Sequence, residues 1–445
     1  MLYHSLENNK NLVSFENAVL TGLSSDGGLY IPEYIPMLNP KFIHNISSYD
    51  IYTIALTVIK PYIEKSIPEK FLKNIIHDTL NFSFPLKKIH DNIHVLELFH
   101  GPTLAFKDIG AQFMAGCLSF FSQKIEKNVT VLVATSGDTG GAVAKGFYNK
   151  PGIEVIILYP YNGISSLQEE QITSLGKNIF SLEIDGNFDD CQKMVKKAFL
   201  DKEIQQKYVL TSANSINIAR WLSQMFYYFS AYRQIIIEEK IDNSIELIFS
   251  VPSGNFGNIC AGIMSEKMGL PIKFFIASTN INDTIPRFLK TEKYYPLPVK
   301  KTISNAMDIS DPSNFSRIWY LYKKNIYELR KKFISYKFTD DETIKTINMV
   351  WEKYKYMLDP HGAIGYLGLK KYLKKQKVQN DSSTIAIFLE TAHPIKFIDE
   401  IPSFLRKKII FPKKLKTFLS KKRKKQKISL SKDFNIFKDW LLKRK

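Results

Sequence analysis

Cysteine is scarce in this sequence: the 445 residues include only Cys117, Cys191 and Cys260. They lie far apart, form no CxxC pair and leave one thiol over in any disulfide scheme, which argues against a disulfide-stapled scaffold. The chain also lacks an apolar run near the roughly 18 residues of a membrane span. Its first residues lack the basic stretch and apolar segment of a secretory signal. We therefore expect a soluble, reduced, cytoplasmic protein with no membrane partner.

Acidic residues are outnumbered, because 62 Lys and Arg stand against 43 Asp and Glu, for a net charge of +19. Most of the excess lies in residues 401–445, which hold 17 Lys or Arg and two Asp and leave only +4 for residues 1–400. One alternative is thus a nucleic-acid-binding protein acting through its tail. The tail has no recognised binding motif and the body has no broad basic footprint, so no nucleic acid is expected. The tail itself is predicted to be a solvated helix or partly disordered.

The patterning of the chain predicts four segments. Residues 1–95 are mostly helical in pattern and form an N-terminal cap region. From about residue 96, short β-branched runs alternate with helical patterns, as in βαβ units with a parallel sheet. Two such units are expected, with strands at 129–134, 153–158, 245–251 and 272–277 and helices at 140–148 and 258–268. They predict an α/β fold with two domains, 96–240 and 241–400, flanking a cleft. Helices are expected over 313–375, and 401–445 is the basic C-terminal tail.

Each unit has a glycine-rich loop after its first strand, at residues 136–141 and 253–258. Such a loop lets backbone N–H groups converge on an anion at the positive end of the next helix. For either loop alone, a simple tight turn is an equally good interpretation. Neither matches GxGxxG or GxxxxGK[ST], so dinucleotide and nucleoside-triphosphate sites lose support. The two loops together indicate another kind of anionic ligand.

Lys107 follows Leu-Ala-Phe after a Gly-Pro turn. A lone lysine in so basic a chain is usually a solvated surface group. Partial desolvation after an apolar run, however, would favour the neutral amine that Schiff-base chemistry needs. His361 and His393 each adjoin a proline and have no metal-like spacing with Asp or Glu, so they are interpreted as structural or as lying one layer behind a site, and no metal is predicted.

Seven motifs in this order resemble those of threonine synthases: HGPTLAFKD (100–108), ATSGDTGGAVA (134–144), SANSINIAR (212–220), VPSGNFGN (251–258), NDTIPRF (282–288), SNAMDIS (304–310) and TAHPIKF (391–397). The opening, from Phe15 to Pro32, is similar too. The resemblance covers roughly residues 1 to 400. It implies the tryptophan-synthase-β-like fold of pyridoxal-phosphate enzymes, fold type II, with the cofactor between two α/β domains.

The resemblance also implies roles for individual residues. Lys107 is the catalytic residue and carries pyridoxal 5'-phosphate as a Schiff base, and Thr391 lies beside the pyridine nitrogen. The cofactor phosphate is held by the backbone of Gly254, Asn255, Phe256, Gly257 and Asn258. The substrate carboxylate is matched to Thr135, Ser136, Asp138 and Thr139, and the substrate phosphate to Asn214, Ser215, Asn217 and Arg220.

Two of these assignments carry an open alternative. Related enzymes of this fold often have Asn in place of Asp138, where it contacts the phenolic oxygen of the cofactor. Because two like charges would repel, Asp138 is not assigned that contact. Arg220, considered without the resemblance, is more readily interpreted as part of a surface salt bridge, although Asn217 and Arg220 are i, i+3 neighbours that can face one ligand.

The reaction implied is the conversion of O-phospho-L-homoserine and water to L-threonine and phosphate, by a pyridoxal-phosphate-dependent β,γ-elimination and hydration. This is the last step of threonine biosynthesis. The nearest alternative is a threonine or serine dehydratase of the same fold. The opening at residues 15–32 and the SANSINIAR segment favour the synthase. The oligomeric state stays open.

Overall fold

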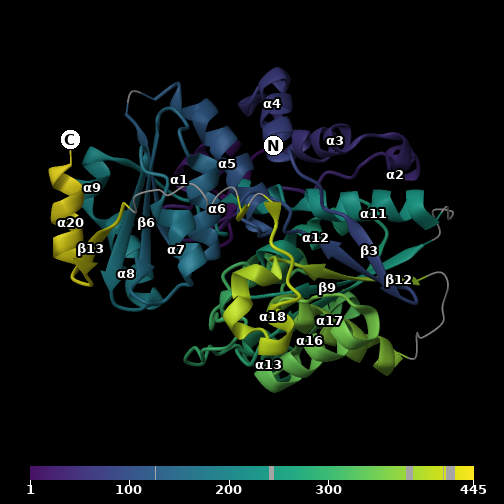
Figure 1. Ribbon diagram of the computed structural model, residues 1–445. Helices are drawn as coiled ribbons and strands as arrows, with labels where there is room; N and C mark the ends of the chain where they lie inside the picture. The colour runs from purple at the N-terminus through teal and green to yellow at the C-terminus, as the bar shows by residue number, and fades with distance from the viewer. Residues whose placement is uncertain (126, 240–244, 377–383, 414, 417–425, 445) are drawn as a thin grey trace.

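Two sheets organise the molecule, one in each of two α/β lobes (Figure 1). The computed structural model describes residues 1–125, 127–239, 245–376, 384–413, 415–416 and 426–444. The smaller sheet is parallel throughout, in the order β13 (Ile428–Ser431), β7 (Ile179–Asp185), β6 (Ile153–Pro160), β5 (Val129–Ala134), β8 (Val209–Ser212). The larger sheet has the order β11 (Phe333–Lys337), β10 (Ile272–Thr279), β9 (Glu246–Pro252), β12 (Thr384–Glu390), β4 (Ile93–Glu97), β3 (Leu86–His90), with only β3 antiparallel to its neighbour.

The strands are apolar on both faces because helices cover both faces of each sheet. In β5, Val131 and Val133 face the core beneath α5 (Lys107–Ser122) and α6 (Asp138–Phe147), whereas Leu132 faces α8 (Phe188–Leu200). The larger sheet is covered by α11 (Met225–Glu239) and α12 (Gly257–Lys267) on one face and by α16 (Asp340–Tyr354) and α17 (Pro360–Gln376) on the other (Figure 1). The predicted α/β class is confirmed, and the six elements predicted for the two βαβ units lie within two residues of the observed ones.

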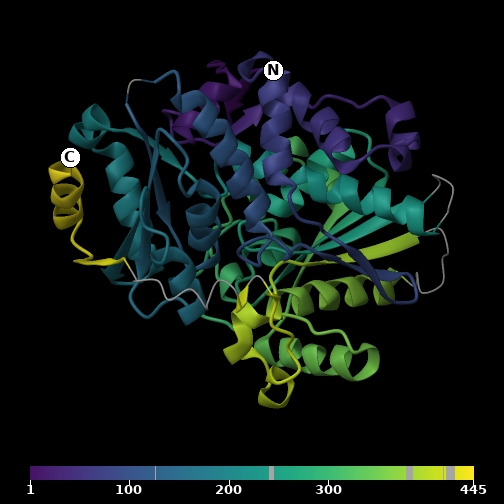
Figure 2. The ribbon, with the colours of Figure 1, turned by 45° about the horizontal axis from the view of Figure 1, so that its top comes forward.

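The N-terminal region joins the two lobes (Figure 2). It contains the paired strands β1 (Tyr3–Ser5) and β2 (Tyr30–Pro32) and the helices α1 (Phe15–Thr21), α2 (Pro40–His44), α3 (Ile51–Ile63) and α4 (Glu69–Thr79). Helix α1 packs on β8 and α5, and α3 packs on α11. The remaining elements are η1 (Ile46–Ser48), η2 (Glu64–Ser66), α7 (Ser166–Thr173), α9 (Lys202–Lys207), α10 (Ile218–Leu222), α13 (Thr284–Thr291), η3 (Asn305–Met307), α14 (Phe315–Leu321), α15 (Ile326–Lys332), η4 (Pro394–Glu400), α18 (Ser403–Arg406) and α20 (Phe434–Lys443).

The structure departs from the predicted organisation in three places. Strand β4 spans the predicted boundary at 95/96 and pairs with β12, far along the chain. Strand β11 interrupts the region 313–375, for which only helices were predicted, because it pairs with β10 at the sheet edge. The third departure is the C-terminal tail.

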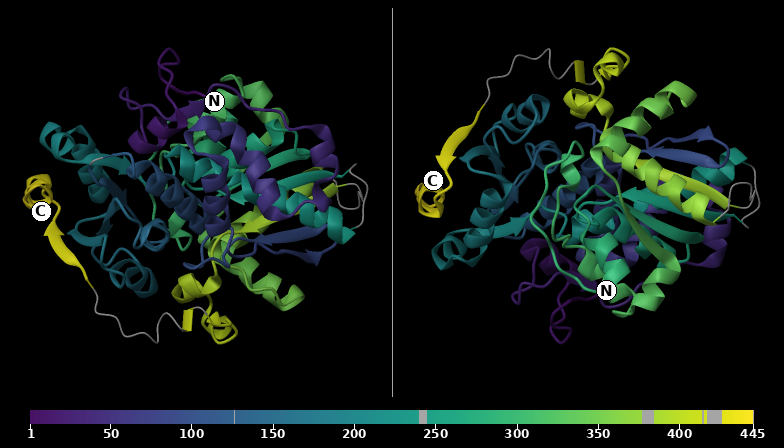
Figure 3. Two further views of the ribbon diagram at one scale, coloured as in Figure 1. Left: turned by 90° about the horizontal axis from the view of Figure 1, so that it is seen from above. Right: turned by 90° about the horizontal axis from the view of Figure 1, so that it is seen from below.

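Residues 426–444 do not form a solvated tail. Strand β13 adds to the edge of the smaller sheet beside β7, and α20 packs on α8 and α9 (Figure 3). Phe437 and Leu441 are completely buried there. Arg444 pairs with Glu154 and lies over the ring of Phe180, 3.7 Å from its centroid. The prediction is therefore wrong for this stretch, because the apolar face of α20 packs against α8 and α9 instead of facing solvent. Residues 417–425 lie outside the described residues.

All three cysteines are buried and free. Within the described ranges, no helix has the length and apolar character needed to cross a membrane.

Candidate functional site

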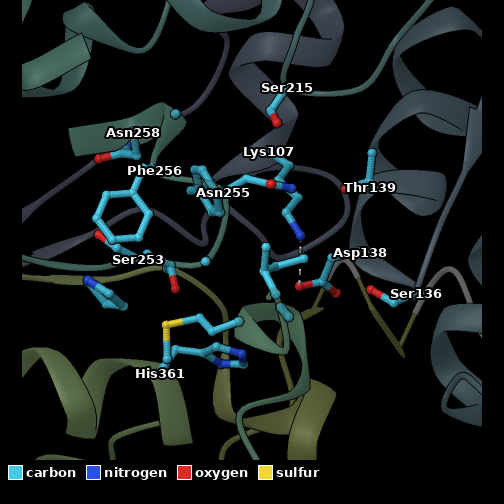
Figure 4. A pocket seen from close by; sticks show the side chains of 18 of the residues that line it. Lys107, Ser136, Asp138, Thr139, Ser215, Ser253, Asn255, Phe256, Asn258 and His361 are labelled. Carbon is cyan, nitrogen blue, oxygen red and sulfur yellow. Dashed lines mark ion pairs between the residues drawn. The ribbon is translucent and has the colours of Figure 1, made fainter. Parts of the chain in front are cut away.

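A pocket lies between the lobes, where strands of both sheets end (Figure 4). Strand β5 leads into residues 135–139, β9 leads into 253–258, and β12 leads directly into Thr391. Parallel strands bring their following loops to one edge, which is the usual place for a ligand in this class of fold. The predicted residues that line the pocket are Lys107, Thr135, Ser136, Asp138, Thr139, Asn214, Ser215, Arg220, Gly254, Asn255, Phe256, Gly257, Asn258 and Thr391.

Lys107 is the first residue of α5, and a backbone bridge fixes its position. Ala105 pairs with Ala392, and the N–H of Phe106 donates to the carbonyl of Thr391 at 2.8 Å. The lysine and the threonine, distant in sequence, are thereby held on adjoining segments. The Lys107 side chain is 15% exposed. Burial lowers its pKa to about 8, although the Asp138 carboxylate opposes that shift. A substantial fraction of the amine is thus neutral near pH 8.

The second glycine-rich loop forms an anion cradle at the start of α12. Phe256 precedes the helix with a left-handed backbone (φ 59°), and no side chain caps this helix start. A Cβ on Gly254 would lie 2.9 Å from Ala306 O and Met307 Cα, so only glycine fits against that loop. The Asn258 side chain is already engaged with Tyr228 and Gln224, which leaves its backbone N–H for a ligand. A phosphate fits this set of backbone donors.

The first glycine-rich loop lies on the opposite side of Lys107. Gly137 has φ 125°, and a Cβ there would come within 2.3 Å of the Gln168 side chain. The Thr135 hydroxyl accepts hydrogen bonds from the N–H groups of Gly137 (2.9 Å) and Gly140 (2.8 Å), so it organises the loop. Ser136 and Thr139 lie beside Lys107 in the pocket (Figure 4). These hydroxyls and the start of α6 suit a carboxylate.

Asp138 is buried between two lysines. One carboxylate oxygen accepts from Lys396 Nζ (2.8 Å) and Gln168 Nε2 (3.0 Å), and the other lies 4.0 Å from Lys107 Nζ. Burial by itself raises the pKa of Asp138, but Lys396 and Lys107 outweigh it and hold that pKa well below its usual range. Asp138 is therefore ionised. Lys396 lies within the TAHPIKF motif, yet nothing in its local pattern pointed to this contact.

Arg220 provides a buried cation on the same side of the pocket. Its side chain is 4% exposed, Nη1 donates to Ala213 O at 2.7 Å, and the buried Nε has no partner. Burial lowers the pKa of Arg220 to about 10, with Asp108 opposing, so the guanidinium stays charged. The Asn214 side chain donates through Nδ2 to Ala134 O at 3.3 Å, and the Ser215 hydroxyl accepts from Asn314 at 3.2 Å, which leaves its own O–H to donate to a ligand. An anion can enter this group without displacing a salt bridge to Arg220.

Asn217 does not join this group. Its Oδ1 caps α10 through the N–H of Ala219, and its Nδ2 donates to Val19 O at 2.9 Å. The side chain is fully buried against the N-terminal region rather than facing the pocket. The i, i+3 spacing to Arg220 therefore does not bring both side chains to one ligand, because α10 begins at Ile218 and Asn217 serves as its cap.

Several pocket residues were missed from the sequence, notably Gln224, Met307 and His361. His361 was interpreted as structural or as lying one layer behind a site. Its Nδ1 does bond the buried Asp359 at 2.6 Å, but its Nε2 is buried without a partner and the ring lines the pocket. Sequence spacing could not indicate this, because His361 reaches the pocket from α17 on the far side of the larger sheet. Across the described residues, no group of three or more His, Cys, Asp or Glu could hold a metal.

Comparison with known proteins places this geometry in a family. Residues 80–390 match the family described as "Pyridoxal-phosphate dependent enzyme", and residues 2–80 match "Threonine synthase N terminus". The chain is 43% identical to a threonine synthase of Buchnera aphidicola (subsp. Schizaphis graminum), covering 100% of both. It resembles the crystal structure of threonine synthase from Escherichia coli with TM-score 0.89, 37% identity and 99% coverage of each chain. It also resembles a threonine synthase with bound pyridoxal phosphate from Brucella melitensis, with TM-score 0.89, 32% identity and coverage of 99% and 98%.

Proposed function

Because this chain belongs to the threonine synthase family of pyridoxal-phosphate-dependent enzymes, we propose that it converts O-phospho-L-homoserine and water to L-threonine and phosphate in the cytoplasm. The observation that supports this best is the presence of two separate anion sites around Lys107. The start of α12 suits a cofactor phosphate, and the buried Arg220 suits a second phosphate on the substrate. A dehydratase acting on an unphosphorylated amino acid would have no use for the second site. The match to the N-terminal family also favours the synthase over that alternative.

The residues present fit the cofactor. Lys107 supplies the amine, the backbone from Gly254 to Asn258 supplies the phosphate cradle, and Thr391, which lines the same pocket, supplies a hydroxyl rather than a carboxylate. When bound, pyridoxal phosphate withdraws electrons from the substrate and makes its Cα and Cβ protons acidic.

The protein's own groups then perform three tasks. Lys107, partly neutral because burial lowers its pKa to about 8, accepts and returns the Cα proton. Ser136, Thr139 and the start of α6 hold the substrate carboxylate and so orient Cα toward that amine. Arg220, with Asn214 and Ser215, binds the γ-phosphate and stabilises the charge that grows on it as it leaves.

A direct test measures phosphate release and threonine formation from O-phospho-L-homoserine by the purified protein. Lys107→Ala should abolish turnover together with the visible absorbance band that borohydride reduces. Lys124→Ala, at an exposed lysine just beyond the end of α5, is the control and should retain both. Faster deamination of L-threonine than turnover of the phosphorylated substrate would contradict the proposal.

A further inference from the structure

A second lysine, Lys396, lies completely buried behind the pocket wall. It belongs to η4, and its side chain is 0% exposed. Its ammonium donates to Asp138 Oδ1 (2.8 Å), Thr103 O (2.9 Å) and Gln171 Oε1 (3.3 Å). An ammonium group has three donors, and these three acceptors use all of them. Lysine is almost never fully buried unless paired, and Lys396 meets this condition through its ion pair with Asp138.

The ion pair connects Lys396 to Lys107 through Asp138. One oxygen of that carboxylate is bound by Lys396 and Gln168, whereas the other faces Lys107 Nζ at 4.0 Å, beyond direct hydrogen-bond distance. The carboxylate is thus oriented mainly by Lys396. The negative charge of Asp138 is therefore balanced mainly by Lys396 at 2.8 Å and less by Lys107 at 4.0 Å.

Other titratable groups lie around the same space. Arg220 lines the pocket beside Lys107, and Asp108 is buried at the next position of α5, where it is bound by Thr103. His361 enters from α17. This space therefore contains three cations, Lys107, Lys396 and Arg220, and two carboxylates, Asp138 and Asp108. Removing one lysine changes the electrostatic environment of the other lysine and hence its pKa.

We propose that Lys396 is a positioning residue that holds Asp138 in place and balances its charge, so that Asp138 does not capture the Lys107 amine in a direct salt bridge. The inference deepens the proposed function, since it rests on Lys107 being the reactive amine. Without Lys396, the carboxylate has Lys107 as its nearest cation. A direct pair would then stabilise the ammonium form of Lys107 and withdraw the neutral amine. In the intact protein, Lys396 adds to the lowering of the Lys107 pKa that burial causes.

The test measures the pH dependence of Lys107 acylation by acetic anhydride in cofactor-free protein, read by mass spectrometry, with the exposed Lys301 as internal reference. Lys396→Met should raise the apparent pKa of Lys107 by about one unit or more, which is a roughly tenfold loss of labelling near neutral pH. The double variant Asp138→Asn/Lys396→Met removes both charges and should return the profile to that of the unaltered protein.

Equal labelling profiles in the unaltered protein and the Lys396→Met variant would overturn the proposal, as would a double variant that behaves like the single one. If the single variant does not fold, the double variant decides: a folded protein with the original profile supports the proposal, and a shifted profile or an unfolded protein refutes it. Labelling needs neither cofactor nor substrate. It is therefore independent of the turnover assay, whose failure would contradict the proposed reaction instead.

Discussion

Replacing Arg220 by alanine tests whether the second anion site binds the substrate. Arg220 is 4% exposed, its guanidinium donates to Ala213 O, and its Nε is buried without a partner. The side chain nevertheless lines the pocket, and the guanidinium has five N–H donors, of which Nη1 uses one on Ala213 O. Arginine's fork presents two aligned donors to a phosphate, which lysine cannot do.

A hydrogen bond to a charged group contributes about 1.5–3 kcal/mol. At about 1.4 kcal/mol per factor of ten, Arg220→Ala should lower kcat/KM for O-phospho-L-homoserine by roughly tenfold to more than a hundredfold. Arg220→Lys should recover only part of the loss, because it restores the charge but not the fork. Neither change should alter the cofactor absorbance spectrum, since the cofactor phosphate has its own cradle at α12.

The assay is steady-state phosphate release, with inhibition by inorganic phosphate as a second measure of the site. Arg233→Ala is the matched control, because this arginine on α11 bonds Tyr49 O and lies outside the pocket. Its kcat/KM should be unchanged. If Arg220→Ala turns over the phosphorylated substrate normally and is inhibited by phosphate as before, Arg220 is a structural residue and the reasoning fails.

Three further predictions concern stability. Because burial lowers the pKa of Lys107 to about 8 from roughly 10.4 in the unfolded chain, the native state binds fewer protons between these values. The resulting penalty is therefore full below pH 8, shrinks as the pH rises from about 8 to about 10.4, and is absent at higher pH. Lys107→Met should therefore raise the unfolding free energy of cofactor-free protein at pH 7 by about 1–3 kcal/mol and leave it unchanged at pH 11 in denaturant titrations. Gly137→Ala should lower the stability by more than about 1 kcal/mol and raise KM, because φ 125° and the Gln168 side chain both oppose a Cβ; an unchanged Tm and KM would show that the loop adapts. Phe437→Ala should cost about 3–5 kcal/mol in thermal or denaturant unfolding, whereas the exposed Ile436→Ala control should cost little; equal effects would mean that α20 contributes no core.

The features that the sequence predicted well are those with local causes. The β5–α6–β6 and β9–α12–β10 units follow from short β-branched runs and helical periodicity, both of which are read over neighbouring residues. The two glycine-rich loops were located because their glycines meet backbone demands at Gly137 and Gly254 that another residue would not. The family resemblance identified Lys107 as the reactive lysine among many. The pocket contains every residue that the resemblance implied except Asn217.

Tertiary structure decided the features that depend on distant partners. Lys396 is indistinguishable from other lysines until folding places it against Thr103, 293 residues away in the chain, and against Asp138. His361 lines the pocket only because α17 packs across the larger sheet. Asn217 points away from the pocket because its Nδ2 donates to Val19 O in α1. The apolar face of α20 looked like part of a solvated basic tail. Its pattern gives no sign that the preceding strand β13 pairs with β7 at the sheet edge, which brings α20 onto α8 and α9. Local propensity acts within a few residues, whereas burial and ion pairing are set by whichever segments the fold brings together.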